Sequence, residues 1–171
     1  MDADERRNRI SRMIASSQSP VTGGELAAKT GVTRQIVVQD VAILRAGGFP
    51  IIATPSGYIM IDSPAVRMPS KVFACRHNTP EEAREELLII VENGGTVRDV
   101  IVEHPVYGEI TGTLMLRTRD AVEKLMERLA RPDSQMLSSM TGGVHMHTVE
   151  AQSEKELSGI EKELRNAGLL I

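Results

Sequence analysis

The stretch that decides the fold of the first half of the chain is residues 22–45, TGGELAAKTGVTRQIVVQDVAILR. Thr22 stands three residues before Glu25, a spacing typical of a capping box at the start of a helix. Gly31 predicts a tight turn after this short helix, and Thr33 predicts the start of a second, longer helix. A short helix, a turn that contains glycine and a second helix form the helix-turn-helix pattern.

The segments on either side of this motif extend it to a larger domain. Apolar residues recur at helical spacing over residues 5–17, which predicts an amphipathic helix before the motif. Two β-rich runs, residues 50–54 and 58–61, flank Pro55-Ser56-Gly57, a pattern typical of a β-hairpin. We therefore expect a winged helix-turn-helix domain of three helices and a β-hairpin over residues 1–62.

The exposed residues of such a motif suit DNA. The first residues of the second helix meet base edges in the major groove, where Arg suits guanine and Gln suits adenine. The candidates for base contacts are Thr33, Arg34, Gln35 and Gln39. The candidates for phosphate contacts are Lys29, Arg45 and Ser56, the last at the tip of the wing. The alternative is a three-helix packing module in which these residues form an ordinary solvated face.

The composition is that of a soluble globular protein. The chain has 171 residues, of which 41% are hydrophobic and 25% charged, and this length suits one large domain or two small ones. Aromatic residues make up 2%, so the core depends on aliphatic side chains and nine Met. Neither a signal peptide nor an apolar run of about 18 residues is present, and the single Cys75 fits a reducing compartment. We expect a cytoplasmic protein without membrane segments.

The charge divides unevenly along the chain. The formal net charge is −3, but residues 1–62 carry seven Lys and Arg against six Asp and Glu, which gives +1. Residues 63–171 carry thirteen against seventeen, which gives −4. The direction of this asymmetry favours DNA binding by the first domain, although its size is small.

The rest of the chain alternates strand and helix patterns after a linker at residues 63–70, which begins with Ser-Pro and ends with Pro-Ser. The order is βαββαβ with a trailing helix, which predicts a split βαβ, ferredoxin-like α/β sandwich and an α+β fold class overall. That scaffold hosts many functions and decides none. The predicted strands are residues 72–77, 97–103, 109–116 and 144–149, and the predicted helices are 80–92, 118–130 (or from 120) and 154–166, within a regulatory domain over residues 71–171.

The histidines of this second domain suggest a metal site. His145 and His147 flank one residue on a predicted strand, so both side chains point to the same face. His77 ends another predicted strand just before an acidic helix start. On a helical wheel centred on Leu87, Glu86 lies at the flank of the apolar face, whereas Glu85 points away from it. Three histidines and one carboxylate suit Zn, Ni or Fe(II).

Each of these residues also has a simpler interpretation. The His145–His147 pair would hydrogen-bond on a half-exposed sheet, and the glutamates would solvate their helix. His104, next to Pro105, is typical of a structural or exposed turn residue. Cys75 shares a strand face with His77 and is either a soft ligand or a small buried thiol. The chain has no HExxH, no glycine-rich phosphate loop and no nucleophile elbow, so sensing is favoured over catalysis and we expect no enzyme.

Taken together, these features resemble the niacin-responsive transcriptional repressors of bacteria, which pair a winged helix with a three-histidine regulatory domain. The likeness covers nearly the whole chain. The stretches that carry it are TRQIVVQD (33–40), ATPSGY (53–58), DVIVEHPVYGEI (99–110) and GGVHMH (142–147).

The resemblance implies a homodimer that binds a palindromic operator in double-stranded DNA and represses genes for making or importing NAD precursors, with nicotinic acid as corepressor. It also implies a transition metal (Ni, Zn or Fe) held by three histidines and a helix glutamate, the second of a Glu-Glu-Leu run. The implied metal ligands are His77, Glu86, His145 and His147, with Glu85 and Glu82 as alternatives because this chain has one extra residue before the run. His104 and Tyr107 are the candidates for effector contacts.

Two alternative functions stay open from the sequence. One is a regulator of the same architecture that senses another small molecule or the metal ion itself. The other is a metalloenzyme with an accessory DNA-binding module.

Overall fold

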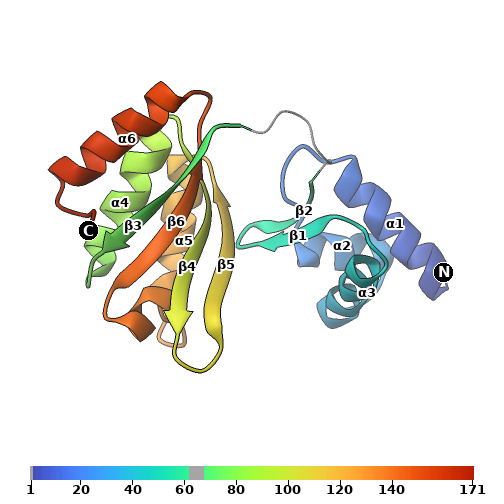
Figure 1. Ribbon diagram of the computed structural model, residues 1–171. Helices are drawn as coiled ribbons and strands as arrows, with labels where there is room; N and C mark the ends of the chain where they lie inside the picture. The colour runs from blue at the N-terminus through green and yellow to red at the C-terminus, as the bar shows by residue number, and fades with distance from the viewer. Residues whose placement is uncertain (1, 62–67) are drawn as a thin grey trace. The chain divides into compact units, whose positions relative to one another are not determined.

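The computed structural model describes residues 2–61 and 68–171, which divide into two compact units, Met1–Val66 and Arg67–Ile171 (Figure 1). We call these the N-terminal unit and the C-terminal unit. Most of the linker expected at residues 63–70 lies outside the described residues, and its last residue, Ser70, is the first residue of a strand. No helix in the described ranges is both long enough and apolar enough to cross a membrane.

The N-terminal unit has the expected three helices and hairpin. The hairpin pairs Thr54 with Gly57 at its tip, and Val21, just before the second helix, pairs with Tyr58. The wing is therefore held against the start of the helix-turn-helix motif. The elements are α1 (Ala3–Ala15), α2 (Gly23–Thr30), α3 (Arg34–Ala46), β1 (Ile51–Thr54) and β2 (Gly57–Met60).

The helix boundaries follow from local hydrogen bonds. Thr22 and Glu25 cap each other's backbone N–H at the start of α2, as the spacing predicted, and Gly31 ends this helix in the left-handed conformation. The Thr33 hydroxyl accepts the N–H of Ile36 and caps α3. Helix α1 begins earlier than the apolar pattern indicated, because the Asp2 carboxylate forms a second capping box at its start.

A buried ion pair joins α1 to α3 within an aliphatic core. The Asp40 carboxylate is 2% exposed, and its Oδ2 lies 2.6 Å from Nε of Arg6 on α1. Nη1 of Arg7 approaches the other oxygen at 3.5 Å. Because α3 turns Asp40 and its apolar face inward, the opposite face, which carries Arg34 and Gln39, is left exposed. The core residues are Ile10, Ile14, Leu26, Ala27, Val37, Val41, Leu44 and Ile51.

The C-terminal unit is a four-stranded antiparallel sheet in the order β3-β6-β4-β5. Helix α4 joins β3 to β4 with β6 between them, and α5 joins β5 to β6 with β4 between them, so the split βαβ prediction is confirmed. Here β3 and β5, the first and third strands of this unit, form the edges of the sheet. In the usual ferredoxin-like order, the second and fourth strands form the edges. The elements are β3 (Ser70–Arg76), α4 (Pro80–Glu92), β4 (Thr96–His104), β5 (Gly108–Leu116), α5 (Arg119–Leu129), the 3-10 helix η1 (Leu137–Thr141), β6 (Val144–Glu150) and α6 (Glu154–Asn166).

The helices of this unit pack on one face of the sheet and enclose its core (Figure 1). The burial pattern of strand β6 reflects this one-sided packing: His145, His147 and Val149 are buried beneath the helices, while the alternate residues Val144 and Met146 are only half-buried. The helix η1 was not expected from the sequence. The core residues are Phe73, Cys75, Leu87, Leu88, Ile90, Val91, Val97, Leu116, Val122, Val149, Ala151, Leu157, Ile160, Leu164 and Leu169.

Two glycines form the turn between η1 and β6. Gly142 (φ 63°) and Gly143 (φ 90°) both have the positive φ that favours glycine. A Cβ on Gly142 would meet no atom within 4 Å, whereas a Cβ on Gly143 would overlap the carbonyl oxygen of His77. The turn therefore passes directly against the end of β3.

Replacing each glycine with alanine separates strain from close packing. We expect Gly142→Ala to lower the free energy of unfolding by about 1 kcal/mol, the cost of a left-handed alanine. Gly143→Ala adds a backbone clash and should cost at least about 2 kcal/mol more, in the range of overpacked cores. Denaturant unfolding of both variants measures the difference. Equal losses would show that the turn relaxes away from His77 without cost.

Candidate functional site

The start of α4 positions a buried carboxylate. Thr79 caps the helix and Pro80 occupies its first turn, so the helix begins three residues after His77. Two turns later Glu86 points inward and is 0% exposed. Glu85 is exposed, and Glu82 is used at the helix start, where its Oε2 accepts the N–H groups of Asn78 and Thr79. Of the three glutamates that the sequence left open, the structure brings Glu86 to the histidines.

Three imidazoles converge on this carboxylate. Nε2 of His77 lies 2.6 Å from Oε2 of Glu86, and Nε2 of His145 lies 3.2 Å from the same oxygen. Nε2 of His147 lies 3.1 Å from Oε1. All three histidines are at most 5% exposed. We call His77, Glu86, His145 and His147 the three-histidine cluster; it joins the end of β3, helix α4 and strand β6.

The outer nitrogens of two histidines are held by backbone carbonyls. Nδ1 of His145 donates to the carbonyl of Gly143 at 2.8 Å, and Nδ1 of His147 donates to the carbonyl of Asp99 at 2.6 Å. Because a carbonyl only accepts, each Nδ1 carries a hydrogen, and a neutral ring then turns the lone pair of Nε2 toward Glu86. Lone pairs from the rings and the carboxylate face one another unless a proton or a metal ion lies between them.

These contacts shift the pKa values of Glu86 and His147. Burial raises the pKa of Glu86, but hydrogen bonds from the three imidazoles outweigh burial and hold that pKa well below its usual value. Burial lowers the pKa of His147, but the hydrogen bond and charge of Glu86 outweigh it and raise that pKa. The carboxylate is thus kept ionised in an interior where an uncompensated charge is costly.

The donor set fits a divalent transition metal. Histidine nitrogens and one carboxylate oxygen suit Zn, Ni or Fe(II). Carbonyl acceptors behind two of the rings are the usual outer contacts of metal-bound histidines. Nδ1 of His77 differs, because it is buried without a hydrogen-bond partner among the described residues.

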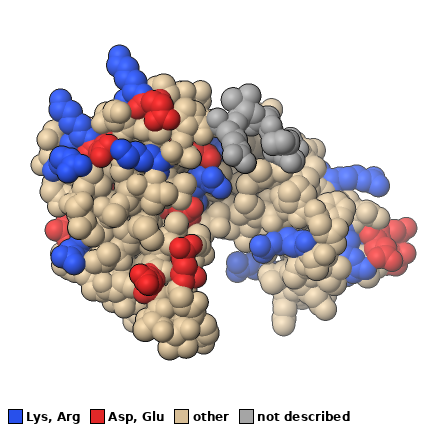
Figure 2. Space-filling model, in the orientation of Figure 1, with Lys and Arg blue, Asp and Glu red and all other residues tan. Residues whose placement is uncertain are grey.

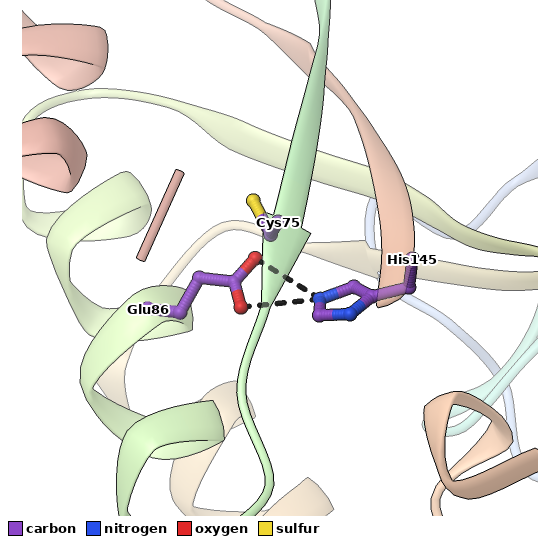
Figure 3. Close-up of side chains that lie close together, drawn as sticks. All are labelled: Cys75, Glu86 and His145. Atoms are coloured by element: carbon purple, nitrogen blue, oxygen red, sulfur yellow. Dashed lines mark hydrogen bonds and ion pairs between the residues drawn. The ribbon is translucent and has the colours of Figure 1, made fainter. Parts of the chain in front are cut away.

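Cys75 offers a second ligand set. The Cys75 sulfur, a Glu86 oxygen and a His145 nitrogen all lie within 4.8 Å of one another, on β3, α4 and β6 (Figure 3). Burial raises the pKa of the Cys75 thiol, and the nearby Glu86 charge raises it further, so the thiol stays neutral. The buried position agrees with the interpretation of Cys75 as a small core thiol, while its distance from Glu86 keeps the ligand role open.

The two residues expected to contact an effector lie in a different place. His104 and Tyr107 belong to the turn between β4 and β5, where Tyr107 is 78% exposed. Nδ1 of His104 accepts the N–H groups of Val106 and Tyr107 at 3.1 and 3.2 Å, and the two rings lie 5.1 Å apart. His104 therefore orders its own turn, and neither residue lines the cavity found beside the three-histidine cluster. Their effector role stays a prediction.

The N-terminal unit presents the expected DNA-contacting residues on its surface. Thr33 and the side chains of the first turns of α3 are exposed, and Ser56 is exposed at the turn of the wing, where its N–H bonds to Thr54 Oγ1. Figure 2 shows basic side chains along this unit, with acidic ones at its far end, where α1 begins. The exposed candidates are Lys29, Thr33, Arg34, Gln35, Gln39, Arg45 and Ser56.

Comparison with known proteins matches each of the two units to a known domain family. Residues 6–59 match an HTH domain, and residues 70–171 match a 3H domain. The chain is 42% identical to the probable transcription repressor NiaR of Thermotoga maritima (strain ATCC 43589), over 98% of this chain and 94% of the relative. It is 41% identical to the transcription repressor NadR of Bacillus subtilis (strain 168), over 97% of this chain and 93% of the relative.

These matches span almost the whole chain and both of its units, and they confirm the family that the sequence motifs resemble. The chain belongs to the NiaR/NadR family of transcription repressors and is a DNA-binding repressor, not an enzyme.

Proposed function

We propose that this repressor contains a divalent transition metal and binds its operator more tightly when nicotinic acid is bound. The observation that carries the proposal is the buried convergence of three imidazoles on the Glu86 carboxylate. The operator is a palindrome read by a homodimer, and the repressed genes make or import NAD precursors. These features rest on the resemblance of the motifs in both units to niacin-responsive repressors.

The three-histidine cluster would hold the metal through its four side chains. The metal, Ni, Zn or Fe(II), supplies positive charge and a coordination position open to a carboxylate. His145 and His147 are oriented for this by the carbonyls behind them, and Glu86 is oriented by its helix. The ionised carboxylate balances part of the metal charge inside the unit.

Replacing the paired histidines tests this ligand set against the one that includes Cys75. We expect His145→Ala with His147→Ala to remove the metal, because two of the four ligands are lost. Cys75→Ala should keep the full metal content, because all four side chains of the three-histidine cluster remain. Elemental analysis of the purified proteins gives the metal per chain. One metal per chain in the double variant would overturn the assignment, and loss in Cys75→Ala would make the thiol a ligand.

Two copies of α3 would read the operator. In a dimer, the recognition helices meet major grooves one turn apart, about 34 Å. Arg34 and Gln35 at the start of α3 are exposed and supply the paired donors and acceptors that base edges require. Arg45 near the other end of α3 suits the phosphates.

Loss of Arg34 should change the sequence specificity of DNA binding, whereas loss of Arg45 should change the affinity for all DNA sequences. We expect Arg34→Ala to weaken operator binding by about 1–3 kcal/mol and to relax specificity at one base pair. Arg45→Ala is the matched control; it should weaken binding to all sequences alike and reduce the salt dependence of affinity. Titrations onto operator and scrambled DNA at several salt concentrations separate the two. Unchanged operator affinity in Arg34→Ala would move base reading to other residues.

The effector proposal is tested by titrating the metal-replete protein onto operator DNA with and without nicotinic acid, at fixed salt. A ligand shifts DNA affinity only if it binds the DNA-competent state better than the other state. We expect at least tenfold tighter binding, which is about 1.4 kcal/mol of coupling. Equal affinity in both titrations would assign another effector to the same repressor.

A further inference from the structure

A cavity of about 160 Å³ lies beside the three-histidine cluster, and the sequence did not indicate it. His77, His145 and His147 line one part of it, so it borders the cluster itself. The sheet, α4, α5 and the start of η1 supply the other walls. Most of the remaining lining is aliphatic or Met, and it includes Leu87, Leu114, Leu125, Met126 and Leu129.

The size and chemistry of the cavity define a class of ligand. A cavity of about 150 Å³ lined by apolar side chains accommodates one benzene molecule. Aliphatic walls favour a flat, apolar ring, whereas a metal ion held by the three-histidine cluster would attract an anion such as a carboxylate to that end of the cavity. The cavity therefore fits a single aromatic ring that bears one carboxylate.

Ser138 adds a polar group to the apolar wall. It lies in η1, is 5% exposed and lines the cavity. Its backbone carbonyl accepts the N–H of Gly143, which fixes the residue against the turn that precedes β6. Its hydroxyl can both donate and accept a hydrogen bond, and the residue lines the cavity.

We propose that this cavity is the effector site and that Ser138 is its specificity residue. An aromatic monocarboxylate binds with its carboxylate toward the three-histidine cluster and its ring between Leu87 of α4 and Leu129 of α5. The Ser138 hydroxyl donates to a ring nitrogen. This inference rests on the proposed function for the identity of the acid, and it moves effector contacts away from His104 and Tyr107.

The experiment compares two acids that differ only at the ring nitrogen. Calorimetric titration of the metal-replete full chain with nicotinate and with benzoate gives both affinities. Leu129→Phe fills the cavity and should weaken both acids at least tenfold, while Met140→Phe, at an exposed position of η1 that does not line the cavity, leaves both unchanged. Ser138→Ala should weaken nicotinate by about threefold to tenfold, the value of one hydrogen bond, and benzoate by less than twofold. Ser139→Ala, at an exposed neighbouring serine, is its control.

Each outcome decides one part of the proposal. Undiminished binding of both acids to Leu129→Phe would overturn the location, and equal losses of both acids in Ser138→Ala would overturn the role of the hydroxyl. No binding of either acid to the unmodified chain at millimolar concentration would overturn both. Circular dichroism and metal content show that each variant is folded, and Ser138→Ala carries the test if Leu129→Phe is not. Nicotinate that binds in the cavity without changing DNA affinity would instead overturn the proposed function alone.

Discussion

The packing of the C-terminal unit depends on how the buried charge of Glu86 is compensated. Glu86 is fully buried with its pKa held well below the usual value, and an unpaired carboxylate in an apolar interior would be strongly destabilising. Its compensation comes from two imidazoles on β6 and one that directly follows β3, so the end of β3, helix α4 and strand β6 must meet at one point. The close turn at Gly143 follows from the same requirement, because its carbonyl orients His145 while its backbone passes against His77.

The parts of this arrangement that were predictable from the sequence are those set by local chemistry. The spacing of Thr22 and Glu25 fixed the start of α2, and the alternation of β6 placed His145 and His147 on one face. The choice of Glu86 over Glu85 also followed from local geometry, because one position in a helical turn decides whether a side chain points toward the apolar face or away from it. These features depend on residues fewer than about five positions apart.

The parts that were not predictable depend on contacts between distant segments. Strand order is one: the βαββαβ pattern is compatible with more than one set of edges, and pairing of β3 with β6 across some 70 residues selects this one. The cavity is another, since its walls come from the sheet, two helices and η1. Ser138 carried no sequence signal, because nothing in the local pattern distinguishes it from the adjacent Ser139. The link from Asp40 to Arg6 was missed for the same reason: it joins residues 34 positions apart.

Among the described residues, each unit buries one carboxylate next to basic side chains, and the kind of basic side chain decides whether the carboxylate is balanced permanently. Asp40 is paired with the guanidinium groups of Arg6 and Arg7, which stay charged at any physiological pH. Its charge is therefore balanced permanently, and α1 is held to α3 whatever the surroundings. Glu86 faces imidazoles, which carry positive charge only when protonated and otherwise offer lone pairs to a metal. The balance of charge around Glu86 thus depends on what is bound there, whereas the balance of charge around Asp40 does not.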